Sequence, residues 1–295
     1  MYYGYMIKTS KIQKIETLLD RGDSKYLENG VCVKEDGHST ILAVCDSFSK
    51  PYDDKNNPIV LFGELSSGEI VKNIFYRAIE KSHIKDSLLS IVKEADNQIK
   101  EFQKRAGFPF RSDSLAGLVF AIAKISQEKI EIIQGGDCIA LWKNKNGSIE
   151  FTPNIVLAAS KFVRKAFSDL LQECNGDRNA ARAKFTPILM GERMQGVNQN
   201  HKTAYPIMNG QLNIKLCFQK TIDTNNVKTL ILFADGLIPF QWLENKTRMK
   251  ELVKNIEKGG LDYQLQITRK EQLAGKTKKD TARFPESAAV TAYFG

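Results

Sequence analysis

Leu230-Ile231-Leu232-Phe233-Ala234-Asp235-Gly236-Leu237 is a short apolar run that ends in a carboxylate and a turn. The same pattern leads from residue 41 into Asp46 and from residue 130 into Asp137. Apolar runs of this length, bounded by turn residues, are typical of buried strands. Each strand brings its final acidic side chain to the rim of a sheet. Because Mg²⁺ and Mn²⁺ prefer carboxylate oxygens, three such strand ends predict a metal site assembled by tertiary folding.

The order of the predicted elements indicates an α+β fold. Two strands at 29–35 and 40–46 form a hairpin around Gly37, and Ser66 with Glu69 has the spacing of a capping box that opens a helix. The remaining predicted elements are a helix at about 84–106, strands at 115–125, 129–134, 138–143, 213–219, 228–234 and 288–294, and helices at 159–174, 178–193 and about 239–258. Because strands cluster and helices cluster, we expect antiparallel sheets and a single domain over residues 1–295.

Composition favours a folded protein of a reducing compartment. Hydrophobic residues make up 42% of the chain, and no apolar stretch approaches the ~20 residues of a membrane helix. The first residues lack the order of a signal peptide. Four of the five cysteines lie in or beside apolar runs, and they are predicted to be buried free thiols: Cys32, Cys45, Cys138 and Cys217. We therefore expect a cytoplasmic protein with no membrane partner and no structural zinc site.

The net charge of +9 is concentrated toward the C-terminal end, where much of it falls between Lys246 and Lys279. A solvated helix face followed by a basic loop explains such a run, and nucleic-acid binding is the alternative. No known nucleic-acid motif accompanies the run, so we do not expect a nucleic-acid partner. A basic rim could equally attract a phosphorylated substrate.

Taken in order, these motifs resemble the metal-dependent, type-2C Ser/Thr protein phosphatases over about residues 20–295. Val44-Cys45-Asp46-Ser47 resembles the Val-x-Asp-Gly motif of that family. Gly135-Gly136-Asp137-Cys138 resembles its Gly-Asp-Ser hairpin, and Ala234-Asp235-Gly236 its Ser-Asp-Gly strand end. The resemblance implies a sandwich of two packed antiparallel β-sheets flanked by helices, with a variable flap at about 155–227. It also implies hydrolysis of phosphoserine or phosphothreonine in a phosphorylated protein substrate.

The resemblance further implies a set of metal ligands around two or three Mn²⁺ or Mg²⁺ ions. Asp46 would bridge two ions that share a water. The carbonyl of Ser47 would bind one of these ions, and Glu28 would serve the same ion through waters. Asp235 would bind the other ion. Asp137 matches the residue that, in bacterial relatives, helps to hold a third ion.

The last implied ligand precedes the final strand, and two carboxylates compete for this role. The register of residues 288–290 favours Glu286. Asp280 is the alternative, but it would place Pro285 in the strand, and proline does not suit a central strand. Glu286 would carry one more methylene than the family's usual aspartate.

Three departures from the family pattern bear on activity. Asn29 stands where the family has the aspartate of a Glu-Asp pair, and Ser47 where it usually has glycine. Ser24 replaces the family's phosphate-binding arginine, so Lys25 or Arg21 would have to bind the phosphate. A catalytically impaired pseudophosphatase that acts as a binding or regulatory module is therefore the alternative function.

Overall fold

The computed structural model describes residues 11–50, 60–61, 63–83, 85–239, 242–243, 245–274 and 284–295. Two five-stranded antiparallel sheets form the centre of this part of the chain. The strands of the first sheet are, in spatial order, β1 (Ile12–Asp20), β12 (Ser287–Phe294), β11 (Val227–Phe233), β8 (Ile139–Asn144) and β9 (Ile149–Phe151). The second sheet has the order β10 (Phe218–Asp223), β7 (Lys129–Gly135), β6 (Gly117–Ile125), β3 (Thr40–Phe48) and β2 (Asn29–Glu35). The predicted two-sheet α+β sandwich is thus confirmed.

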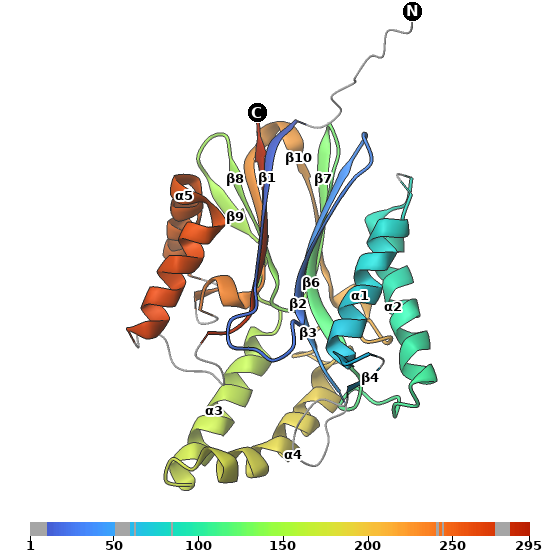
Figure 1. Ribbon diagram of the computed structural model, residues 1–295, viewed down its shortest axis with the longest axis vertical. Helices are drawn as coiled ribbons and strands as arrows, with labels where there is room; N and C mark the ends of the chain where they lie inside the picture. Colours follow the sequence, from blue (N-terminus) through green and yellow to red (C-terminus); the bar gives the residue numbers. More distant parts are fainter. Residues whose placement is uncertain are drawn as a thin grey trace, which may run out of the picture.

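Helices cover the outer faces of both sheets (Figure 1). The second sheet is covered by α1 (Ser67–Lys81) and α2 (Leu88–Arg105), and the first by α5 (Lys246–Leu273). Two further helices, α3 (Leu157–Glu173) and α4 (Arg178–Gly196), lie beyond one end of the sandwich. A short ribbon of β4 (Val60–Leu61) and β5 (Leu65–Ser66) precedes α1. None of the described helices is long and apolar enough to cross a membrane.

Alternation along β3 decides which of its side chains face the site. Leu42 and Val44 belong to the core between the sheets, whereas Ala43 and Cys45 pack in the core under α1 and α2. Because successive strand side chains point to opposite faces, Asp46 faces the space between the sheets. It lies where that apolar space reaches the end of the sandwich.

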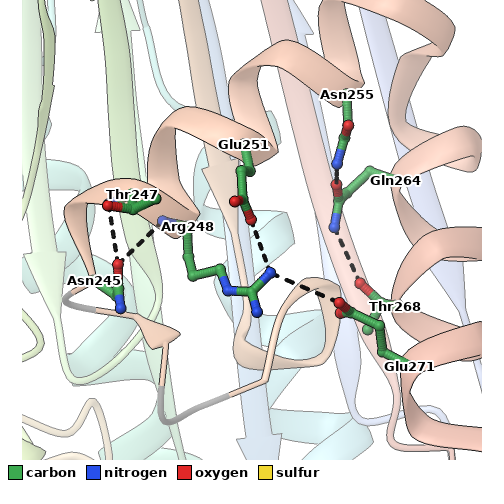
Figure 2. A network of polar contacts seen from close by, with 8 residues as sticks. All are labelled: Asn245, Thr247, Arg248, Glu251, Asn255, Gln264, Thr268 and Glu271. Atoms are coloured by element: carbon green, nitrogen blue, oxygen red, sulfur yellow. Dashed lines mark hydrogen bonds and ion pairs between the residues drawn. The ribbon is translucent and has the colours of Figure 1, made fainter. Parts of the chain in front are cut away.

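The α5 helix is a hairpin of two antiparallel halves. The backbone leaves the helical conformation at Gly260 (φ 80°). Residues on either side of this break then meet: Asn255 Nδ2 donates to Gln264 Oε1 at 2.9 Å, and Arg248 Nη1 lies 3.7 Å from Glu271 Oε1 (Figure 2). The second half therefore runs back along the first, toward the end of the sandwich that carries the turn after β11.

Several predicted boundaries need correction. The predicted strand at 213–219 is wrong over its first half, because the Asn213 side chain accepts a hydrogen bond from Lys215 N (3.3 Å) and starts the 3₁₀ turn Ile214–Leu216. The strand that follows is β10. The helix predicted at about 84–106 begins only at Leu88, because Ser87 caps it by accepting from Ser90 N at 3.1 Å.

The C-terminal helix and the first strand also differ from prediction. The helix predicted at about 239–258 begins at Lys246, capped by Asn245, and continues past the break to Leu273. The strand β1 was not predicted, since polar residues interrupt its apolar ones. It pairs along the whole of β12 and completes the first sheet.

Candidate metal centre

The predicted acidic side chains gather at one end of the sandwich, around Asp46. Burial raises the pKa of Asp46 well above its ordinary value. The rest of the rise comes from the negative charges of four surrounding carboxylates, namely Asp235, Asp137, Glu286 and Glu28. Each of these five residues keeps part of its surface in contact with solvent. Segments far apart in the sequence thus meet in one wet, strongly negative site.

These carboxylates interact through their charges without forming a closed coordination sphere. In the part of the chain that the structure describes, no three His, Cys, Asp or Glu side chains are arranged to hold one metal ion. The two observations are compatible. Coulomb repulsion acts over many ångströms, whereas coordination requires oxygens at roughly 2.0–2.6 Å from the ion.

The turn after β11 brings Asp235 against the start of β12. A Cβ atom on Gly236 would lie 1.7 Å from the Glu286 carbonyl oxygen, so only glycine allows this approach. Glu286 directly precedes β12, as the sequence register predicted. The alternative ligand, Asp280, lies outside the described residues.

Glu286 is held by donors from the start of β2 and from the loop before it. Asn29 N donates to Glu286 Oε2 at 2.7 Å, and the Ser24 hydroxyl also binds this carboxylate. Burial raises the pKa of Glu286, and the charge of Glu28 adds to the rise, while the hydrogen bonds from Asn29 and Ser24 oppose it. The Ser24 that replaces the family's arginine therefore contacts a candidate ligand directly.

Glu28 is directed toward the start of α1. Its Oε1 accepts from Ser66 Oγ at 2.7 Å and from the Ser49 hydroxyl, and burial raises its pKa. Ser66 is also the N-cap of α1, and its reciprocal hydrogen bonds with Glu69 confirm the predicted capping box. Glu28 therefore contributes negative charge to the site, and its carboxylate also accepts hydrogen bonds from two hydroxyl groups.

Ser47 continues β3 as a regular strand residue. It pairs with Leu118 of β6, and its hydroxyl donates to the carbonyls of Glu28 (2.5 Å) and Gly68 (3.0 Å). This side chain ties the loop that carries Glu28 to the first turn of α1. The family's usual glycine has no hydroxyl to make these bonds.

Asp137 lies in the tight turn between β7 and β8. Gly136 has a φ of 86°, and a Cβ there would lie 2.1 Å from Val119 Cγ1. The Gly136 carbonyl is held by Gln134 Nε2 at 2.6 Å and by Ile155 N at 3.2 Å. Burial raises the pKa of Asp137 to about 6, and the positive charge of Arg164 on α3 opposes the rise.

Arg164 was not among the predicted site residues, because nothing in its sequence neighbourhood relates it to Asp137. The two predicted phosphate-binding residues, Arg21 and Lys25, are exposed on the loop after β1. The ammonium of Lys25 lies 5.0 Å from the centre of the Tyr26 ring. Both residues lie within four positions of Ser24 in the sequence.

The side chains at this end of the sandwich suit a hard divalent cation in their chemistry. All five are oxygen donors, the type that Mg²⁺ and Mn²⁺ prefer. Their mutual repulsion raises the pKa of Asp46, and a bound cation would relieve that repulsion. The cysteines Cys45 and Cys138 are buried near the site, and burial raises the pKa values of both thiols.

Solved structures have the same architecture, although sequence comparison finds no relative. No protein-family model and no curated protein sequence matches the chain. The serine/threonine phosphatase Stp1 from Staphylococcus aureus is 14% identical, with a TM-score of 0.59 and coverage of 100% of both chains. PstP/Ppp from Mycobacterium tuberculosis is 12% identical, with a TM-score of 0.56 over 95% of this chain and 98% of that one.

A second PstP structure, of the catalytic domain in complex with two manganese ions, is also 12% identical. It has a TM-score of 0.55 and covers 95% of this chain and 97% of that one. At such low identity the matches establish the architecture, which agrees with the resemblance seen in the sequence motifs. The chain therefore has the fold of the bacterial metal-dependent Ser/Thr phosphatases, in a strongly divergent sequence.

Proposed function

We propose that this protein is a Mn²⁺- or Mg²⁺-dependent phosphatase that acts on phosphoserine or phosphothreonine in proteins. One observation carries the proposal: the carboxylates predicted from the sequence surround Asp46 at one end of a sandwich with the fold of Ser/Thr phosphatases. The five free cysteines, four of them buried, support action in a reducing compartment such as the cytoplasm.

Bound divalent ions would supply a water of lowered pKa and would neutralise charge on the phosphoryl oxygens. In this proposal Asp46, Asp137, Asp235 and Glu286 hold the ions, with the Ser47 carbonyl and Glu28 serving the same cluster. Asn29 and Ser24 orient the Glu286 carboxylate through their hydrogen bonds. Arg21 and Lys25 attract the substrate phosphate to the edge of the site.

A binding module without catalysis is the second candidate, and the surroundings of Glu28 favour it. That carboxylate is bonded to the hydroxyls of Ser49 and Ser66, and the family's phosphate-binding arginine is absent. Such a module would keep the sandwich and recognise phosphorylated segments without hydrolysing them.

Hydrolysis of a small aryl phosphate and of a phosphothreonine peptide, with Mn²⁺, with Mg²⁺ and after exhaustive chelation, separates the two candidates. The enzyme should be active with a divalent ion and inactive without one. If Asp46 supplies even ~3 kcal/mol of transition-state stabilisation, Asp46→Asn should lower the rate on the order of a hundredfold. Asp235→Asn should be comparably severe, and Asp137→Asn should mainly raise the metal concentration required.

The control variant is Asp169→Asn on the exposed surface of α3, which should retain full activity. Activity that survives chelation would refute the metal-dependent reaction. Inactivity with every divalent ion, together with binding of the phosphopeptide, would establish the binding module instead. Titration with Mn²⁺ decides between the two C-terminal carboxylates: Glu286→Gln should weaken binding sharply, and Asp280→Asn should change it little.

A further inference from the structure

Arg269, on the second half of the α5 hairpin, contacts both residues that flank Glu286. Its Nη2 donates to the carbonyl of Pro285 at 2.7 Å and lies 3.2 Å from the hydroxyl of Ser287. The same nitrogen pairs with Asp20 Oδ2, at the end of β1, at 2.5 Å. The Arg269 side chain is only 15% exposed, so these contacts are shielded from water.

We infer that Arg269 is a positioning residue for Glu286 and fixes where that carboxylate lies in the metal centre. The inference rests on the proposed function, since it concerns a ligand of the proposed site. Glu286 precedes β12 and has no ladder partner of its own in that strand. Arg269 contacts the residues on both sides of Glu286, and so it holds the backbone from which the carboxylate reaches the hydrogen bonds of Asn29 and Ser24.

The contacts made at position 269 require the donor geometry of an arginine side chain. Nη2 points toward three oxygens, and Nη1 donates to Gln272 Oε1 at 2.9 Å on the same helix. A planar guanidinium can bind acceptors in two directions at once, whereas a lysine ammonium is a compact point charge on a flexible stem. The guanidinium carbon also lies 5.4 Å from the centre of the Phe284 ring, which keeps its plane in place.

The position of the Glu286 carboxylate can be followed without any metal. Its Oε2 accepts the Asn29 amide proton at 2.7 Å, and Asn29 belongs to the other sheet. In the β2–β3 pairing, Ser47 N bonds to the Glu28 carbonyl, so the Asn29 amide points away from β3 and toward Glu286. Exchange of this single amide proton therefore reports whether Glu286 is in place.

The same hairpin offers a matched control. Arg248 lies on the first half of α5 and pairs with Glu251 Oε2 at 2.8 Å and with Glu271 Oε1 at 3.7 Å (Figure 2). Its guanidinium carbon lies 4.0 Å from the centre of the Trp242 ring. Within the part of the chain that the structure describes, its hydrogen bonds and ion pairs go to Glu251 and Glu271 and not to residues 284–287. Its removal should therefore disturb the hairpin but leave the contacts of Arg269 with Pro285 and Ser287 intact.

The first experiment titrates Mn²⁺ by calorimetry into the full chain and its variants. Arg269→Gln should weaken Mn²⁺ binding by about tenfold or more, the range typical of residues that orient metal ligands. Arg269→Lys should recover only part of the loss, and Arg248→Gln should leave the affinity within about twofold. In a Glu286→Gln background the effect of Arg269→Gln should vanish, because Arg269 acts through that carboxylate. Equal losses for the Arg269 and Arg248 variants, or additive losses in the double variant, would overturn the inference.

The second experiment measures hydrogen exchange of the Asn29 amide in metal-free protein by NMR. Arg269→Gln should accelerate this exchange by about tenfold, relative to neighbouring amides of β2, while Arg248→Gln should not. Unchanged exchange in folded Arg269→Gln would overturn the inference even if metal affinity falls. If the wild-type protein bound no Mn²⁺, the proposed function would fail, and the exchange measurement would still decide the role of Arg269.

Discussion

Two helical pairs border the candidate centre, and they are built differently. The α5 hairpin packs on the outer face of the first sheet through a row of buried residues: Met249, Leu252, Val253, Ile256, Leu261, Gln264 and Thr268. In α3 and α4 together, the buried residues are Ala159, Ala181 and Gly196. The α5 hairpin is thus firmly packed on the sheet, whereas α3 and α4 are attached through few buried residues.

Part of the region between α3 and α4 is hollow, although the Phe167 and Phe185 rings pack edge to face elsewhere between them, with centroids 5.1 Å apart. A hollow of about 450 Å³ is lined by residues that include Phe162, Ile188 and Gln195. Phe162 is 58% exposed, a large exposure for an aromatic residue. This region falls within the flap that the sequence predicted at about 155–227. We expect sequence changes here to alter what the protein recognises more than whether it folds.

The largest difference between α5 and the α3–α4 pair should be the effect of a substitution on the free energy of unfolding. Ile256 on α5 is 1% exposed, so Ile256→Ala should lower the free energy of unfolding by about 3 kcal/mol through lost burial and the cavity left behind. Phe162→Ala should change it by less than about 0.5 kcal/mol, because the ring is mostly in water. Urea unfolding followed by circular dichroism measures both. Equal losses would show that α3 is as firmly anchored as α5.

A smaller effect should follow from the polar chain that joins α5 to the turn carrying Asp235. Thr268 is fully buried, and its hydroxyl donates to the Leu237 carbonyl at 2.7 Å. The same hydroxyl accepts from Gln264 Nε2 at 3.1 Å (Figure 2). Thr268→Val keeps the shape but leaves both partners unsatisfied, so it should cost about 2 kcal/mol of stability. Thr268→Ser, which retains the hydroxyl, should recover most of this loss. Two variants of equal stability would exclude the hydrogen bond as the cause.

A sequence pattern can point to candidate site residues more readily than to the contacts that support them. Asp46, Asp137 and Asp235 could be predicted as candidate ligands because an apolar run ending in a carboxylate is a local pattern. The extent of α5 was not predictable in this way. Its second half depends on a reversal at Gly260 and on contacts with distant segments, such as Thr268 with Leu237.

The orientation of the candidate ligands could not be predicted from the sequence either. The hydrogen bonds from Ser49 and Ser66 to Glu28 join residues 21 and 38 positions apart. Arg269 lies 16 positions before Pro285, on a helix whose boundaries were themselves mispredicted. Periodicity and motif spacing report which face a residue occupies, and they contain no information on such pairwise contacts between elements.

The smallest effect concerns the pH dependence of the α3–α4 region, through Glu192 on α4. Its carboxylate accepts from the Tyr205 hydroxyl at 3.0 Å. Burial raises the pKa of Glu192, and the hydrogen bond from Tyr205 and the charge of Arg193 only partly oppose the rise. The folded state therefore binds this proton more tightly than the unfolded state. It follows that the contribution of Glu192 to stability falls as the pH rises from the ordinary carboxyl value of 4.5 through the raised value.

Glu192→Gln should remove this dependence, and urea unfolding of both proteins across a pH series measures it. The wild-type protein should lose stability relative to the variant as the pH rises, by less than about 1 kcal/mol in total, because solvent screens a half-buried carboxylate. Glu173→Gln on the exposed surface of α3 is the control for a general charge effect. A wild-type protein that instead gains stability over the variant with rising pH would mean that the ionised carboxylate, held by Tyr205 and Arg193, stabilises this region. The α3–α4 pair would then be fixed by specific polar contacts, as α5 is.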